Sequence, residues 1–393
     1  LSSDMDKTDK VVVFIEECRR MGLRLTPPAI NVSEYRFTVG ESGEIRYGLG
    51  AIKGVGEGAI EALTREREQG GPYRDPFDLC RRVDLHKLNR RVLESLIRSG
   101  ACDALGPNRA TLAAQLPEAL QLAEQHSRND AAGQDDLFGL AAAGKTPARP
   151  PRVVEKPEWD EEERLRGEKE TLGVYLTGHP ISRVEAELTA LHTTRLRDLT
   201  GNGGTPRRGN GDRSMLIAGL VVGLRTRNAS RGGRIAFVTL DDGSGRLEVR
   251  IFPEVYERHR QLIVEDAILL VQGALGWDEF NQTTRLNVER VLDLDEARAE
   301  YARRLLLRLD ARQCEAGVPR RLADVLAGHR ADGRCAVWVE YTGAGARVEL
   351  ALGPNWQVKP SEALLRQLRE LTGAAGARLL YDQPPAPDRN NRA

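Results

Sequence analysis

The chain has 393 residues, 40% of them hydrophobic and 30% charged, and this length predicts several domains because a single core rarely grows beyond about 250 residues. Lys plus Arg and Asp plus Glu both total 58, so no net field draws the protein onto nucleic acid or membrane, and nucleic-acid binding would need local patches. The five cysteines form no CxxC pair, which argues against a zinc site or a disulfide framework. Without an apolar run of about 18 residues, no membrane association is predicted, and a reducing cytoplasm is the expected location.

Residues 1–105 are predicted to be mostly helical. Apolar residues at helical spacing in "DKTDKVVVFIEECRRMG" indicate a helix that stops at Gly22. Two alternating runs flank "GESG" in "YRFTVGESGEIRYGLG", which predicts a β-hairpin. The glycine-rich turn of "AIKGVGEGAIEALTRERE" leads into an amphipathic helix, and "LNRRVLESLIRSGACDALG" indicates another helix that is closed by Gly100.

Between residues 106 and 157 the composition shifts to Ala, Gln, Asp, Gly and Pro, which is typical of a linker. One helix is expected inside it, in "NRATLAAQLPEALQLAEQH". Residues 158–210 are predicted to form a helical connector. Its sequence "EWDEEERLRGEKE" carries opposite charges at helical spacing, as an exposed, salt-bridged helix face does, and "GNGGTPRRGNGDR" marks its end.

Residues 211–295 show five strand patterns with one short helix between the third and fourth, the order of an oligonucleotide-binding (OB) barrel. Residues 296–393 mix a helix expected at 297–309 with two alternating strands and the helix "SEALLRQLREL", which indicates a small α/β domain. The predicted fold class is therefore multidomain α+β: a helical helix-hairpin-helix domain, a linker, a five-stranded OB-fold β-barrel and a small C-terminal α/β domain.

The stretch "KGVGEG" is a candidate DNA-backbone contact. Gly54 and Gly56 let a backbone approach closely, the helix that starts near Gly58 adds its positive end, and Lys53 adds a cation. This spacing is typical of a helix-hairpin-helix element, which contacts phosphates without reading the base sequence. The alternative is an ordinary glycine-rich connection between two helices.

A second candidate lies between the first two strands of the barrel. The sequence "LRTRNASRGGR" is expected to place four arginines on one flexible loop at the barrel mouth, namely Arg225, Arg227, Arg231 and Arg234. Phe237 on the second strand could stack a base. The alternative makes the arginines solubilising groups and Phe237 a core residue, and we favour the core position for Phe237 because aromatic residues make up only 5% of the chain.

The sequence "QDDLF" raises the question of why a polar linker keeps a leucine and a phenylalanine. Gln134, Leu137 and Phe138 have the pattern of a short linear peptide that inserts anchor side chains into a preformed pocket, and they resemble the consensus by which bacterial polymerases bind the ring-shaped sliding clamp. The alternative is a hydrophobic cluster that packs onto a neighbouring domain. No catalytic and no metal-binding residues are predicted, since Asp4 and Asp6 have no third carboxylate nearby.

Five segments, in this order, resemble the C-terminal portion of the bacterial DNA polymerase III alpha subunit, the C-family replicative polymerase. They are "SSDMDKTDKVVVFIEECRRMG", "YRFTVGESGEIRYGLGAIKGVGEGAIEAL", "LNRRVLESLIRSGACD", "QDDLFGL" and "EKETLGVYLTGHPI". The resemblance spans residues 1 to about 295 and continues more loosely to the end of the chain.

The resemblance implies a role for each part. Residues 1–105 would form the end of the fingers and a helix-hairpin-helix domain that touches duplex DNA through Gly54, Gly56 and Gly58. The linker would bind the beta sliding clamp, the barrel would approach single-stranded template, and residues 296–393 would bind the tau subunit of the clamp loader. The palm with its catalytic aspartates would lie upstream of Leu1, so this chain is expected to lack polymerase activity and any cofactor, with Mg²⁺ needed only by the palm.

Three other interpretations stay open. The family has an error-prone branch, but that branch typically lacks the clamp motif and the tau-binding tail. A free-standing adaptor would bind clamp and DNA without catalysis, and an in-frame palm upstream of Leu1 would exclude it. An unrelated nucleic-acid-binding protein would need the order of the five segments to be accidental.

Overall fold

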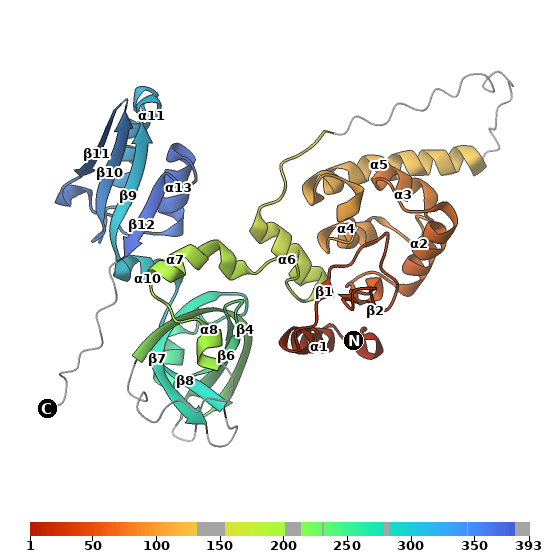
Figure 1. The fold of residues 1–393 in the computed structure, drawn as a ribbon, viewed down its shortest axis with the longest axis horizontal. Coiled ribbons are helices and arrows are strands. Elements are labelled where there is room, and N and C mark those ends of the chain that lie inside the picture. Colours follow the sequence, from red (N-terminus) through yellow and green to blue (C-terminus); the bar gives the residue numbers. More distant parts are fainter. Residues whose placement is uncertain (132–153, 201–213, 230–231, 279–282, 344, 382–393) are drawn as a thin grey trace. The chain divides into compact units, whose positions relative to one another are not determined.

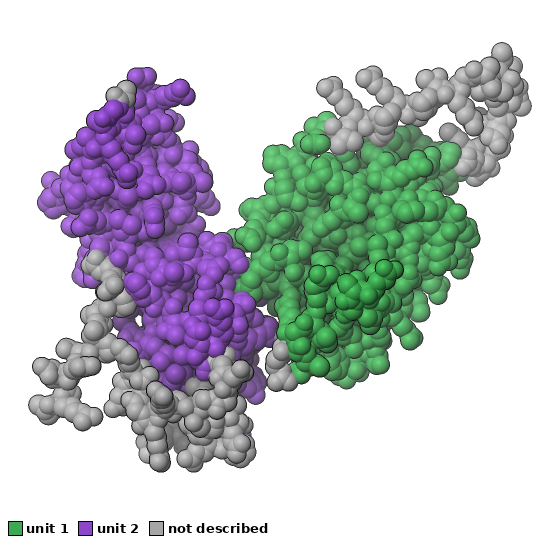
Figure 2. Space-filling view, in the orientation of Figure 1, with its two compact units in different colours: residues 1–180 green, residues 181–393 purple. Residues whose placement is uncertain are grey.

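A computed structural model describes residues 1–131, 154–200, 214–229, 232–278, 283–343 and 345–381 (Figure 1). By its internal contacts the chain divides into two units, residues 1–180 and residues 181–393 (Figure 2). The described helices of the first unit are α1 (Thr8–Arg20), α2 (Glu57–Gly70), α3 (Pro76–Arg82), α4 (Arg90–Arg98), α5 (Arg109–Ala131) and α6 (Glu161–Leu172), with short 3-10 turns at Ser2–Asp4, Leu49–Ala51 and Asp103–Leu105.

A small sheet accompanies these helices. The predicted hairpin around "GESG" is confirmed, because β2 (Thr38–Val39) pairs antiparallel with β3 (Ile45–Arg46). A third strand, β1 (Leu25–Thr26), was not predicted; it pairs parallel with β3 and is only two residues long. Two residues are too few to show an alternating pattern.

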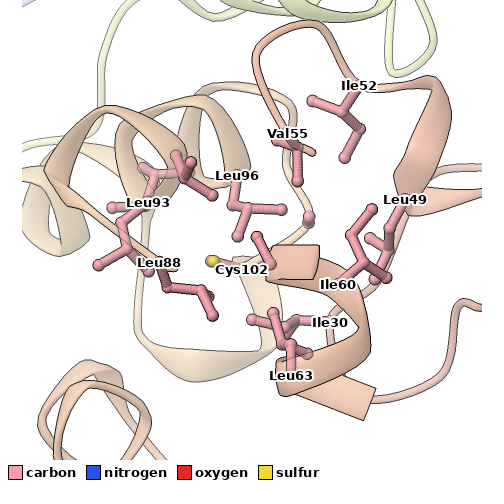
Figure 3. Close-up of a cluster of buried hydrophobic side chains, with 14 of the residues drawn as sticks. Ile30, Leu49, Ile52, Val55, Ile60, Leu63, Leu88, Leu93, Leu96 and Cys102 are labelled. Carbon is pink, nitrogen blue, oxygen red and sulfur yellow. The ribbon is translucent and has the colours of Figure 1, made fainter. Parts of the chain in front are cut away.

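One hydrophobic core holds the first unit together, and Figure 3 shows its centre. Ile60 and Leu63 of α2 face Leu93 and Leu96 of α4 across this cluster, and Val55 from the glycine-rich turn is buried in it as well. The apolar side chains of α4 are therefore on one face, as the sequence pattern predicts. Burying Val55 fixes the turn that precedes α2.

The helix expected within the predicted linker 106–157 is confirmed as α5, but this helix is part of the first core and not of a linker. Helix α5 buries an apolar stripe in the first core at Leu112, Leu116, Ala119 and Ala123. The chain returns at residue 154, where Lys156 donates its backbone N–H to the Thr111 hydroxyl at 3.0 Å. The buried side chains of α5 are three and four residues apart, as on one face of a helix.

The predicted connector 158–210 is also divided between the two units. Helix α6 belongs to the first, whereas α7 (Glu185–Ala190) and α8 (Leu196–Thr200) belong to the second. Helix α6 is more than a salt-bridged exposed face, because the side chain of Glu168 is fully buried. Its carboxylate accepts from the guanidinium of Arg109 at 3.0 Å and from the Thr177 backbone N–H at 3.0 Å.

The second unit contains the closed barrel, with strand order β4-β5-β6-β8-β7. All neighbouring strands are antiparallel except β6 and β8, which are parallel. This confirms the predicted OB-type order, with the helix α9 between the third and fourth strands. The barrel elements are β4 (Ser214–Asn228), β5 (Arg234–Asp241), β6 (Arg246–Ile251), α9 (Pro253–His259), β7 (Ile268–Asp278) and β8 (Thr283–Leu292).

A four-stranded sheet with order β11-β10-β9-β12 follows the barrel, and helices α12 and α13 pack their leucines against one of its faces. Its elements are α10 (Leu294–Tyr301), β9 (Ala302–Asp310), α11 (Ala311–Glu315), α12 (Val318–Ala327), β10 (Ala336–Gly343), β11 (Ala346–Ala351), α13 (Glu362–Thr372) and β12 (Ala377–Tyr381), with 3-10 turns at Pro180–Val184 and Pro354–Trp356.

The helix expected at 297–309 is wrong beyond Tyr301. Residues 302–310 form β9, which pairs with both β10 and β12. Leu305, Leu307 and Leu309 alternate inward there, and their burial between two neighbouring strands outweighs the high helix propensity of leucine and arginine.

Candidate nucleic-acid interface

The glycine-rich turn before α2 presents its backbone to solvent. Gly54 has φ of +83°, a conformation that strongly favours glycine. The first N–H groups of a helix have no acceptor within the helix. Gly56, the N-cap of α2, has no side chain that could accept from them. The Lys53 side chain is exposed beside them, while its backbone N–H is tied to the Thr171 carbonyl oxygen at 2.8 Å.

Crowding within the described chain does not explain the other two glycines. A Cβ atom placed on Gly56 or Gly58 would meet no described atom within 4 Å, and both residues are exposed. Gly100 in the turn after α4 is different, since it is buried and a Cβ there would lie 2.3 Å from the Arg109 guanidinium. Of these two turns, the one before α2 therefore leaves its bare backbone open to an outside group, and the one after α4 does not.

The four predicted loop arginines do not form one loop in the structure. Arg225 and Arg227 lie within β4, two residues apart and on one face, and Arg225 pairs directly with Phe237 of β5. Arg234 begins β5 and belongs to the other side of that strand, since it alternates with Ile235. Arg231 lies outside the described residues. The prediction of one arginine loop is therefore wrong. The described arginines lie on the two strands of a β-hairpin, Arg225 and Arg227 on one face and Arg234 on the other.

Phe237 is outside the barrel, which corrects the core position that we favoured. Its neighbours Ala236 and Val238 are fully buried and point into the barrel, so Phe237 points away from it and is half-buried. The guanidinium carbon of Arg285 lies 5.2 Å from the centre of the Phe237 ring, within cation–π range. An aromatic ring on the second strand with cations beside it suits base stacking.

The adjoining strands extend this surface with residues that the sequence analysis did not single out. Arg250 of β6 pairs directly with Phe237, and its guanidinium lies 4.9 Å from the ring centre of Phe252, which is 41% exposed. Arg250 also donates to the Asn287 amide oxygen of β8 at 2.9 Å. The alternation of "RLEVRIF" could have revealed this face, because Leu247, Val249 and Ile251 occupy the inward positions.

We name this surface the outer barrel face. It comprises outward residues of β4, β5, β6 and β8 and the aromatic residue that follows β6: Arg225, Arg227, Phe237, Glu248, Arg250, Phe252, Arg285 and Asn287. The residues named here include four arginines, two aromatic rings and one carboxylate, and the Asp241–Arg246 ion pair lies on the same side of β5 and β6. Cations beside aromatic rings can hold the phosphates of a single strand while its bases stack.

Comparisons with known proteins agree with this architecture. Profiles of three families match: the helix-hairpin-helix motif at residues 22–112, an OB-fold nucleic acid binding domain at 215–294, and the C-terminal domain of DNA polymerase III subunit alpha at 321–373. DNA polymerase III subunit alpha of Vibrio cholerae is 43% identical over 95% of this chain, and that of Escherichia coli K12 is 45% identical over 97%. The chain matches the C-terminal portion of the bacterial DNA polymerase III alpha subunit.

The resemblance covers only part of those relatives. The chain spans 31% of the Vibrio cholerae protein and 32% of the Escherichia coli protein, their C-terminal part. Among solved structures, the SSB domain of a Synechococcus sp. protein is 19% identical to this chain, covering 23% of this chain and 98% of its own length with a TM-score of 0.19. The fold class and the family expected from the sequence are both confirmed.

The remaining predicted site lies elsewhere. Gln134, Leu137 and Phe138 fall outside the described residues. Within the described ranges, no group of three or more His, Cys, Asp or Glu side chains is placed to hold a metal ion. None of the described helices is both long enough and apolar enough to cross a lipid bilayer.

Proposed function

We propose that this chain is the DNA- and partner-binding part of a replicative DNA polymerase III alpha subunit, with its barrel on single-stranded template. The outer barrel face carries this proposal, because Phe237 and Arg250 lie on the second and third strands, which OB folds use for nucleic acid, and Arg285 adds a cation over the Phe237 ring. The chain as a whole has zero net charge, so a local surface of this kind is what such binding requires.

Duplex DNA would bind at the turn before α2. Gly54, Gly56 and Gly58 leave the backbone bare at a helix N-terminus, where N–H groups can donate to phosphate oxygens, and Lys53 adds a positive charge. The family-level match to a helix-hairpin-helix motif supports this assignment. Such contacts hold the duplex in register without selecting its sequence.

The sliding clamp would bind the segment with Gln134, Leu137 and Phe138. Leucine and phenylalanine supply the apolar anchor, and the glutamine amide supplies hydrogen bonds. Both flanks of this segment belong to the first unit, since α5 ends at Ala131 and residue 156 is hydrogen-bonded to Thr111. The segment would therefore tether the DNA-binding unit to the clamp.

The tau subunit of the clamp loader would bind the last domain, in the region "NWQVKPSEALLRQLREL". The structure limits which side chains could take part. Leu364, Leu365 and Leu368 of α13 are buried in their own core, whereas Arg366 and Gln367 are exposed. A tau contact through α13 would then use its polar face and not its leucines.

Titrations of the whole chain test the DNA part of this proposal. Fluorescence anisotropy would be measured with a labelled single-stranded oligonucleotide and with a labelled duplex, each at several salt concentrations. We expect both DNAs to bind, with affinity falling as the salt concentration rises. For the single strand, the slope of log affinity against log salt concentration should be about −0.7 for each phosphate contacted. No binding to either DNA at low salt would contradict the proposal.

A further inference from the structure

The outer barrel face contains one carboxylate, Glu248, in the middle of its arginines. Glu248 lies on β6 with its side chain outward, because Leu247 and Val249 on either side are buried in the barrel. One carboxylate oxygen accepts from the guanidinium of Arg225 on β4. The other accepts from the guanidinium of Arg285 on β8 at 2.5 Å.

This bridge extends over the second strand of the barrel. Glu248 pairs directly with Thr239 of β5, and Phe237 lies two residues away on the same face. Arg225 pairs with Phe237 on one side, and Arg285 lies over the Phe237 ring. A nucleic-acid strand that reaches Phe237 must therefore meet the two arginines that Glu248 already holds.

A carboxylate that binds two guanidinium groups makes the same kind of contacts as a phosphate group. The bridge is also open to exchange, since the Arg225 side chain is 77% exposed and exposed ion pairs are worth little in water. An incoming phosphate can replace the carboxylate at Arg225 first. The Arg285 side chain is 13% exposed and stays near the ring.

We propose that Glu248 is an internal competitor for the nucleic-acid phosphates, which keeps Arg225 and Arg285 paired when no strand is bound and limits affinity when one is. This inference rests on the proposed binding of single strands to the outer barrel face. A weaker, faster-exchanging contact suits a polymerase, because the template must pass over the barrel as synthesis advances. The carboxylate would thus set the strength of the contact while Phe237 provides the stacking.

The substitution Glu248→Gln tests this role, because the amide keeps the size of the side chain and removes its charge. Fluorescence anisotropy with a labelled single-stranded oligonucleotide would compare this variant with the unchanged chain across salt concentrations. We expect roughly 3- to 10-fold tighter binding at low salt, an advantage that shrinks as salt rises. Glu185→Gln is the matched control: it removes the same charge from a carboxylate that also pairs with an arginine, Arg195, and it lies on α7, outside the barrel strands.

A second comparison separates competition from simple support of the arginines. In the Glu248→Gln background, Arg225→Gln should weaken binding by a larger factor than in the unchanged chain, because the freed arginine contributes its full charge. Equal or weaker binding by Glu248→Gln, with thermal unfolding unchanged, would overturn the inference and make Glu248 a positioning residue. If neither the unchanged chain nor Glu248→Gln binds single strands, both the proposed function and this inference are wrong. If the unchanged chain binds and Glu248→Gln does not bind more tightly, the inference is wrong and the proposed function is retained.

Discussion

Arg250 lies directly across from Phe237 in the β5–β6 pair, and its guanidinium donates to the neutral amide of Asn287 at 2.9 Å. The partner in this hydrogen bond is neutral, so the bond does not offset the positive charge of Arg250. Arg246, on the same face of β6, differs because its guanidinium pairs with Asp241 at 2.7 Å. The two arginines thus form a matched pair for measuring phosphate contacts.

Arg250→Gln should weaken single-strand binding and reduce the logarithmic salt slope by about 0.7, the value for one lost phosphate contact. Arg246→Gln should change both quantities less, because Asp241 already offsets its charge. Anisotropy titrations at four or more salt concentrations measure both slopes. Equal effects of the two substitutions would show that binding responds to total charge and not to contacts made by Arg250.

The three glycines at the start of α2, Gly54, Gly56 and Gly58, should respond differently to alanine. Gly54→Ala should lower the free energy of unfolding by about 1–2 kcal/mol, because its φ of +83° strains any residue with a Cβ atom. Gly56→Ala and Gly58→Ala should change it by less than about 1 kcal/mol, since the added methyl group meets no described atom within 4 Å. Chemical denaturation measures each change.

The same two variants should nevertheless bind duplex DNA roughly threefold or more weakly, because a methyl group holds the phosphate backbone away from the helix N-terminus. Their binding to the single-stranded oligonucleotide should be unchanged. A Gly58→Ala variant that binds duplex as well as the unchanged chain would place the duplex contact elsewhere.

The clamp motif predicts a loss through its two anchor residues. Leu137→Ala combined with Phe138→Ala should weaken binding to the purified cognate clamp by at least ~2 kcal/mol, as expected for anchor side chains. Leu140→Ala, in the same segment but outside the pentapeptide, is the control and should bind normally. Surface plasmon resonance measures all three. Unchanged binding by the double variant, or no binding by the unchanged chain, would refute the tether.

The buried pair of Arg109 and Glu168 predicts a large effect on stability. Arg109→Met should destabilise the first unit by ~3 kcal/mol or more, since it leaves the fully buried Glu168 carboxylate without its guanidinium partner. Arg98→Met is the control, because its ion pair with Glu170 is exposed and should be worth ~1 kcal/mol or less. Urea denaturation compares the two, and equal losses would contradict this account.

The barrel was the part most accessible from sequence. Its strands alternate apolar and mostly polar residues along "RIAFVTLD" and "RLEVRI", and in the structure these positions alternate between buried and half-buried. The turn before α2 could also be predicted from sequence, because its positive φ at residue 54 favours glycine. Both features depend on local rules that a few neighbouring residues satisfy.

The sequence was less informative where tertiary contacts determine which residues are buried. Composition suggested a linker from residue 106, yet Leu112 and Leu116 are buried in the first core. Glu168 was expected on an exposed helix face, and only the folded chain brings Arg109 to it from 59 residues away. Phe237 lies on the outside of the barrel because it alternates with the buried Ala236 and Val238 along β5. The low aromatic content, from which we favoured a core position, says nothing about this alternation.

Single-strand binding through Phe237 is the central claim and has a direct measurement. Anisotropy titrations with a labelled single-stranded oligonucleotide would compare the unchanged chain with Phe237→Ala and Phe237→Trp. We expect the alanine variant to lose about 1–3 kcal/mol of binding free energy, the usual worth of one stacked base, while the tryptophan variant keeps its affinity. Equal affinity of all three proteins would show that the strand does not stack on the outer barrel face and would contradict the account.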